Sequence, residues 1–97
     1  MPLSPKQRKY LKGLAHSLEP TVRLGRARLT KPVVAETHRT LEAHELIKVR
    51  IDADEGADRR EMATKLATAT SSEVVGNVGK ITILYRARDE KPRIKLP

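Results

Sequence analysis

A short basic segment, Gly25-Arg26-Ala27-Arg28-Leu29-Thr30-Lys31, combines residue types that bind phosphate. A glycine-led turn ahead of a helix exposes backbone N–H groups, and the positive end of the helix dipole favours an anion there. Arginine adds a planar fork that binds phosphate oxygens in pairs. The segment therefore predicts a phosphate clamp, with candidate residues Gly25, Arg26, Ala27, Arg28, Thr30 and Lys31. The alternative is an ordinary strand-to-helix turn with solvated arginines.

Two other stretches supply cations that would extend a basic surface. In a predicted first helix they are Lys6, Arg8, Lys9 and Lys12, and in a predicted strand they are Lys48 and Arg50. The sequence does not indicate whether that helix lies on the same face as the clamp.

Aromatic side chains are too few for a sheet that stacks bases. The chain has two tyrosines and neither Phe nor Trp. Tyr85 shares a strand face with Ile81 and Ile83, which predicts a place in the core or at its rim. Tyr10 lies among the lysines of the first helix, where stacking on a base and partial burial are equally compatible with the pattern. A nucleic acid would therefore be held mainly by its phosphates and shape.

The sequence offers no catalytic or metal-binding motif. His16, His38 and His44 do not form a zinc-binding pattern, and two of them fall near predicted helix ends, where His commonly satisfies terminal carbonyls. The acidic stretch Asp52–Gly56 fails the register of a calcium loop. There is no Cys, so thiolate sites and disulfides are excluded. We expect no catalytic residue, no metal, no cofactor and no enzymatic activity.

The charge of the chain favours an anionic partner. The formal net charge is +8, and residues 1–50 carry 11 basic and 4 acidic side chains against 9 and 8 in the remainder. Such an asymmetry is typical of a binding face for nucleic acid, or less readily for a membrane surface. A length of 97 residues predicts one domain. No apolar run suits a signal peptide or a membrane span, so we expect a cytoplasmic protein. We also expect a monomer.

Hydrophobic periodicity predicts seven elements in the order α-β-α-β-α-β-β. Their expected ranges are a helix over 5–17, a strand over 21–24, a helix from the Thr30 cap to residue 43 or 44, a strand over 46–51, a helix capped by Asp58, and strands over 73–78 and 81–86. The third helix is expected to bury Met62, Ala63, Leu66 and Ala69, and the first to bury Leu11, Leu14, Ala15 and Leu18. Residues 88–97 are expected to form a flexible basic tail.

This order predicts an α/β two-layer sandwich around a four-stranded mixed sheet. Alternating helices and strands favour parallel pairing of the first three strands. The last two strands form an antiparallel hairpin, because Gly79-Lys80 supplies a tight turn. Gly76 and Gly79 also form a Gly-x-x-Gly motif, but between two strands they are better explained by a bulge and a hairpin turn.

Several landmarks give the chain a resemblance to a known family. They are Leu11-Lys12-Gly13-Leu14-Ala15-His16, the Val22 to Thr30 segment, His44-Glu45-Leu46-Ile47-Lys48-Val49, and Gly79-Lys80 running into Leu84-Tyr85-Arg86. In order and spacing they resemble the CRM domain (chloroplast RNA splicing and ribosome maturation) in its stand-alone bacterial, YhbY-like form. The resemblance implies a fold similar to the C-terminal domain of translation initiation factor three.

It also implies non-catalytic RNA binding, with precursors of the large ribosomal subunit as targets of bacterial members. The signature of the family is a KH-like Gly-x-x-Gly loop between the first strand and the second helix. Gly25 to Arg28 occupies that position, with Arg28 in place of the second glycine. The expected function is therefore a ribosome assembly factor that binds ribosomal RNA. The alternatives are a general nucleic-acid binder and a protein-interaction adaptor with a basic face.

Overall fold

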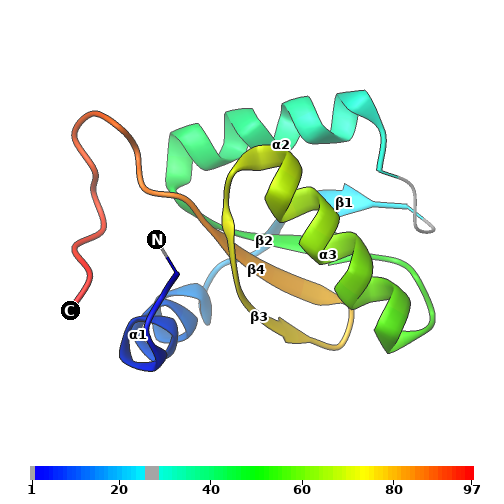
Figure 1. Ribbon diagram of the computed structural model, residues 1–97, viewed down its shortest axis with the longest axis horizontal. Coiled ribbons are helices and arrows are strands. Elements are labelled where there is room, and N and C mark those ends of the chain that lie inside the picture. Colours follow the sequence, from blue (N-terminus) through cyan, green and yellow to red (C-terminus); the bar gives the residue numbers. More distant parts are fainter. Residues whose placement is uncertain (1, 26–28) are drawn as a thin grey trace.

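The computed structural model describes residues 2–25 and 29–97 and contains the predicted order of elements (Figure 1). The elements are α1 (Pro5–Ala15), β1 (Pro20–Leu24), α2 (Lys31–His44), β2 (Leu46–Ile51), α3 (Gly56–Thr70), β3 (Glu73–Val78) and β4 (Ile81–Tyr85). The α/β class and the mixed four-stranded sheet predicted from the sequence are confirmed. None of the helices in the described ranges is long and apolar enough to cross a membrane.

The strands lie in the order β1-β2-β4-β3. β1 and β2 are parallel, whereas β4 is antiparallel to both β2 and β3. Parallel pairing of the first three strands is thus correct for β1 and β2 and wrong for β3, which pairs only with β4. The α3 crossover places β3 one strand position away from β2. The hairpin that follows then places β4 between β2 and β3.

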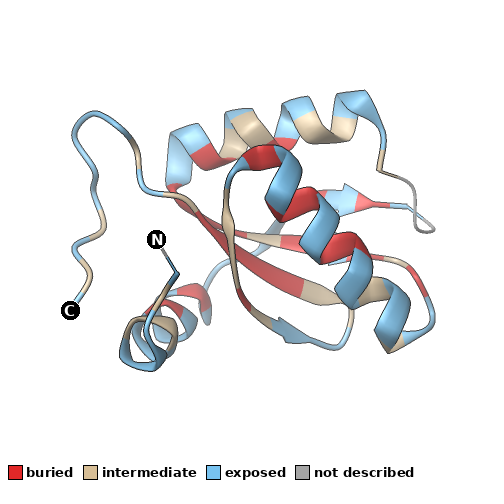
Figure 2. Ribbon diagram, in the orientation of Figure 1, coloured by how far each residue is buried: buried red, intermediate tan, exposed pale blue. Residues whose placement is uncertain are grey.

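Helices cover both faces of the sheet, so the structure has three layers and the predicted two-layer arrangement is wrong. α2 and α3 pack on one face over a core that includes Leu24, Leu41, Val49, Leu66 and Leu84 (Figure 2). α1 packs on the other face, where Leu11 and Ala15 contact a second cluster with Leu46, Val75, Ile83 and Tyr85. Burial of aliphatic side chains on both faces fixes the positions of all three helices.

Local signals set most helix ends. Ser4 and Gln7 form the predicted capping box of α1, with Ser4 Oγ accepting from the Gln7 backbone N–H at 3.1 Å. α3 begins two residues before Asp58, with Glu55 as its N-cap, so the predicted Asp58 cap is wrong. Arg59 donates to the Ala53 and Asp54 carbonyls and holds the chain ahead of this earlier start.

The inward side of α3 differs at one position from the prediction. Ala69 is exposed, and Ala67 and Thr70 are buried in its place. Thr70 tolerates burial because its hydroxyl donates to the Leu66 carbonyl oxygen at 2.8 Å. A buried threonine satisfied in this way is indistinguishable from a solvated one in the sequence.

The Gly76 to Gly79 segment forms the predicted bulge and turn. The register of β3 shifts between Val74 and Gly76, and Gly79 adopts a φ of 57° in the hairpin. A Cβ at Gly76 would lie 2.7 Å from Lys12 Cε, so this glycine leaves room for the lysine stem to cross β3.

The C-terminal segment, residues 88–97, lies beside α1 and is fixed through Glu45 (Figure 1). Glu45 is fully buried at the end of α2, and its carboxylate accepts from the backbone N–H groups of Arg88, Arg93 and Ile94 at 2.9, 2.7 and 3.0 Å. Ile94 and Leu96 pack on the α1 side of the core. The segment thus differs from the solvated tail expected from its composition, because a buried carboxylate binds its backbone.

Candidate nucleic-acid interface

The connection between β1 and α2 carries the predicted clamp. Gly25 is exposed at the end of β1, and Lys31 is exposed as the first residue of α2. Thr30 is the N-cap of that helix, and its hydroxyl accepts from the Val33 N–H at 3.3 Å. Thr30 therefore stabilises the helix start. Arg26, Ala27 and Arg28 lie outside the described residues.

A second group of cations lies on the α1 side of the sheet. Arg23 and Arg50 are paired residues on the neighbouring strands β1 and β2, and their side chains are 71% and 44% exposed. Lys48 lies two residues earlier on β2, on the same face. Its ammonium donates to the carbonyls of His16 and Leu18 at 3.4 and 3.0 Å. Lys48 thus joins the strand to the end of α1, whereas the arginines face solvent.

Asp52 holds the two arginines side by side. Its carboxylate accepts from Arg23 Nε at 2.6 Å and from Arg50 Nε at 2.9 Å. The hydrogen bond from Arg23 is the main reason that the pKa of Asp52 is lowered, and the one from Arg50 adds to it, against a smaller opposing effect of desolvation. Asp52 is therefore ionised at neutral pH and orients both guanidinium groups.

α1 supplies the most uniform charge. It carries four basic residues and no acidic residue, whereas α2 carries two of each and α3 carries three basic and two acidic. Lys6, Lys9 and Lys12 are exposed. Arg8 is partly buried because its guanidinium donates to the Val74 carbonyl and anchors the helix to β3. The three lysines, and not Arg8, are free to meet a ligand.

The basic residues thus lie in three places. α1 lies toward one end of the long axis, and the end of β1 and the start of α2 lie toward the other (Figure 1). On the α1 side of the sheet, Lys48 contacts the end of α1, and Arg23 and Arg50 line the hollow next to Gly25. The surroundings of Gly25 are of mixed sign, because Asp54, Glu55 and Lys80 line the same hollow. Arg23 was not among the predicted site residues, although its alternation with apolar Val22 and Leu24 is a sequence signal that it lies on the opposite, polar face of the strand.

The two tyrosines have different environments. Tyr85 is 6% exposed, as predicted, and burial raises the pKa of its phenol, with the Glu45 carboxylate adding to the rise. Tyr10 is 41% exposed on α1. Of the two tyrosines, Tyr10 is therefore the one whose ring is accessible for stacking on a base.

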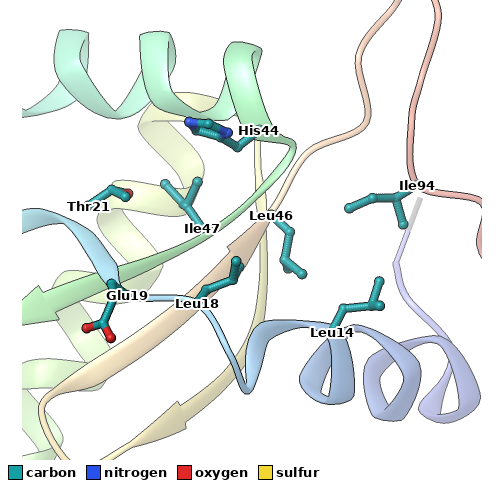
Figure 3. Close-up of a pocket in the computed structure, with 8 residues that line it drawn as sticks. All are labelled: Leu14, Leu18, Glu19, Thr21, His44, Leu46, Ile47 and Ile94. Atoms are coloured by element: carbon teal, nitrogen blue, oxygen red, sulfur yellow. The ribbon is translucent and has the colours of Figure 1, made fainter.

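An apolar hollow of about 350 Å³ separates α1 from the end of α2 (Figure 3). Leu14, Leu18 and Ile94 point into it from one side, and His44 and Ile47 line the other. The two leucines are more than a third exposed, so their predicted burial is wrong: α1 turns only Leu11 and Ala15 fully inward. In the described part of the chain no three His, Asp or Glu side chains gather to hold a metal ion.

Comparison with known families decides the classification. A sequence profile described as the CRS1/YhbY (CRM) domain matches residues 3–86. The chain belongs to the CRM domain family. The family suggested by the sequence landmarks is thereby confirmed.

Relatives of this CRM domain cover nearly its whole length. A Haemophilus influenzae protein named an RNA-binding protein is 40% identical over 95 residues, covering 98% of this chain and 95% of its own length. A Pseudomonas aeruginosa protein named a probable RNA-binding protein is 36% identical, covering 99% and 91%. The solution structure of a Staphylococcus aureus protein proposed to bind RNA aligns with a TM-score of 0.87 at 36% identity, covering 98% of this chain and 99% of that one.

Proposed function

We propose that this CRM domain is a non-catalytic RNA-binding protein that holds structured RNA mainly by its phosphates. The supporting observation is the charge of α1, whose Lys6, Lys9 and Lys12 are exposed with no acidic residue on the helix. Arg23 and Arg50 add exposed cations on the same side of the sheet and line the hollow next to Gly25. Lysine and arginine that neutralise phosphates give an affinity that falls steeply with salt. The names of the relatives point to the same class of partner.

The proposed target is ribosomal RNA in precursors of the large ribosomal subunit, as the family resemblance implies. It is tested by sedimenting tagged protein from cells through sucrose at low and high salt, with the RNA of each fraction identified. We expect co-migration with large-subunit precursors at low salt and its loss at high salt. Migration only at the top of the gradient at low salt would contradict the ribosomal role. Survival of a complex after nuclease treatment would favour a protein adaptor instead.

The proposed clamp at the β1–α2 connection is tested separately. Arg26→Ala together with Arg28→Ala is expected to weaken RNA binding and to reduce the slope of log affinity against log salt by about two, because two phosphate contacts are lost. Arg39→Ala with Arg60→Ala, exposed arginines of α2 and α3, is the control of equal charge. An unchanged slope in the first variant would exclude the clamp.

A further inference from the structure

Tyr10 has an unusual position for an aromatic residue in this chain. It lies on the outer side of α1 and lines a hollow of about 500 Å³ with Lys6, Lys9, Gly13, Leu14 and Pro97. The helix meets the core through Leu11 and Ala15, so the ring is not required for packing. An exposed aromatic side chain in a hollow that two exposed lysines also line suits a ligand with an apolar face and negative charge.

Gly13 keeps the space beside the ring open. Positions three and four residues apart are neighbours on a helix, so Lys6, Gly13 and Leu14 share the face of Tyr10. A Cβ at Gly13 would meet no atom within 4 Å, and its φ is not positive. Neither packing nor backbone geometry therefore requires glycine at position 13. Glycine also makes a helix less stable than alanine does. The open space at Gly13 is consistent with access to the ring.

The charges around the ring select the ligand. α1 has no acidic residue, and Lys6 and Lys9 line the hollow, so two ammonium groups are available to phosphates. A nucleobase has a flat face that stacks on tyrosine, and its strand carries phosphates to either side. We propose that Tyr10 stacks on one unpaired nucleobase of the bound RNA while Lys6 and Lys9 contact the flanking phosphates. This inference depends on the proposed function and adds to it a site that reads single-stranded structure.

Tyrosine fluorescence gives a direct measurement. The chain has no Trp and two Tyr, and Tyr85 is 6% exposed, so quenching by a ligand reports on Tyr10. The probes are a twelve-nucleotide oligoadenylate and an abasic ribose-phosphate strand of the same length. We expect quenching by the first only. Tyr10→Ala is expected to weaken oligoadenylate binding about tenfold and leave abasic binding and the salt slope unchanged. Tyr10→Phe, which keeps the ring, stays within about twofold.

The controls separate this site from the proposed function. Val78→Ala removes another exposed apolar side chain and should change neither affinity. Salt-sensitive binding of both strands, with no quenching and no effect of Tyr10→Ala, would overturn the stacking site and leave the RNA-binding proposal intact. Failure of the protein to bind either strand would overturn the stacking site, and failure to bind a ribosomal RNA fragment as well would also overturn the RNA-binding proposal. Quenching by anionic phospholipid vesicles and not by oligoadenylate would assign the hollow to a membrane surface.

Discussion

Replacing Glu45 with alanine is expected to lower the free energy of unfolding by about 2 to 4 kcal/mol, because a fully buried N–H donor that loses its acceptor costs about 1 to 3 kcal/mol and these donors are partly buried. Three donors are affected, and release of the C-terminal segment into water limits the total. Urea denaturation followed by circular dichroism measures the change. Glu36→Ala, which replaces an exposed glutamate of the same helix, is the control and should change stability by less than about 0.5 kcal/mol.

Glu45→Gln separates geometry from charge. Oε1 of Glu45 accepts from Arg93 and Ile94, and Oε2 accepts from Arg88. A glutamine oxygen keeps the first two bonds, but its amide nitrogen would face the Arg88 N–H, which has no acceptor there. An intermediate loss of stability is therefore expected. Equal stability of the wild type and both variants would show that the carboxylate does not hold the segment.

The same carboxylate makes stability depend on pH. Desolvation by burial acts to raise the pKa of Glu45, but the N–H groups of Arg88, Arg93 and Ile94 together outweigh it and lower the pKa. A lowered pKa in the folded state means that the stabilisation is complete above the ordinary value of about 4.5 and is lost as the pH falls through the folded value. Asp52 titrates in the same direction, so the difference between wild type and Glu45→Gln isolates the contribution of Glu45.

The fold was largely predictable because local signals agreed with the tertiary structure. The α2 and β2 ranges follow from a Thr cap and from clean alternation. The place of β4 between β2 and β3 was missed although the sequence contains a signal for it. Ile83, Leu84 and Tyr85 are apolar in succession, as in a central strand buried on both faces. β3 ends in exposed Asn77 and Val78, as an edge strand does.

The C-terminal segment and the site were less predictable because their contacts involve backbone groups far apart in the chain. Glu45 binds N–H groups more than 40 residues away, and a backbone N–H carries no residue signature. Lys48 was predicted to bind RNA, but it also donates to carbonyls at the end of α1. Predicting the exposure of Tyr10 requires knowing which side of α1 packs on the sheet. The spacing of the leucines indicated that side only approximately, because Leu14 and Leu18 are exposed.

Neutralising the α1 lysines is expected to give the largest loss of RNA affinity. The variant Lys6→Gln, Lys9→Gln, Lys12→Gln removes three exposed charges from a helix without acidic residues. If each lysine neutralises one phosphate, the slope of log affinity against log salt falls by about 2.7 on duplex RNA, taking the value for B-form DNA. If the variant and the wild type bind equally at about 1 M salt, this corresponds to a loss of about 500-fold at about 0.1 M salt. A salt titration by fluorescence anisotropy measures both quantities.

The matched control removes the same charge from the opposite face. Arg39→Gln, Arg60→Gln, Lys65→Gln changes three exposed cations of α2 and α3, each helix also carrying two acidic residues. If α1 is part of the interface, this control keeps most of the affinity and of the slope. Equal losses in the two variants would mean that RNA responds only to the net charge of +8, and a local interface on α1 would be excluded. Both variants remove three positive charges and so reduce the long-range electrostatic attraction equally. A larger loss of affinity in the α1 variant would therefore place the interface on α1.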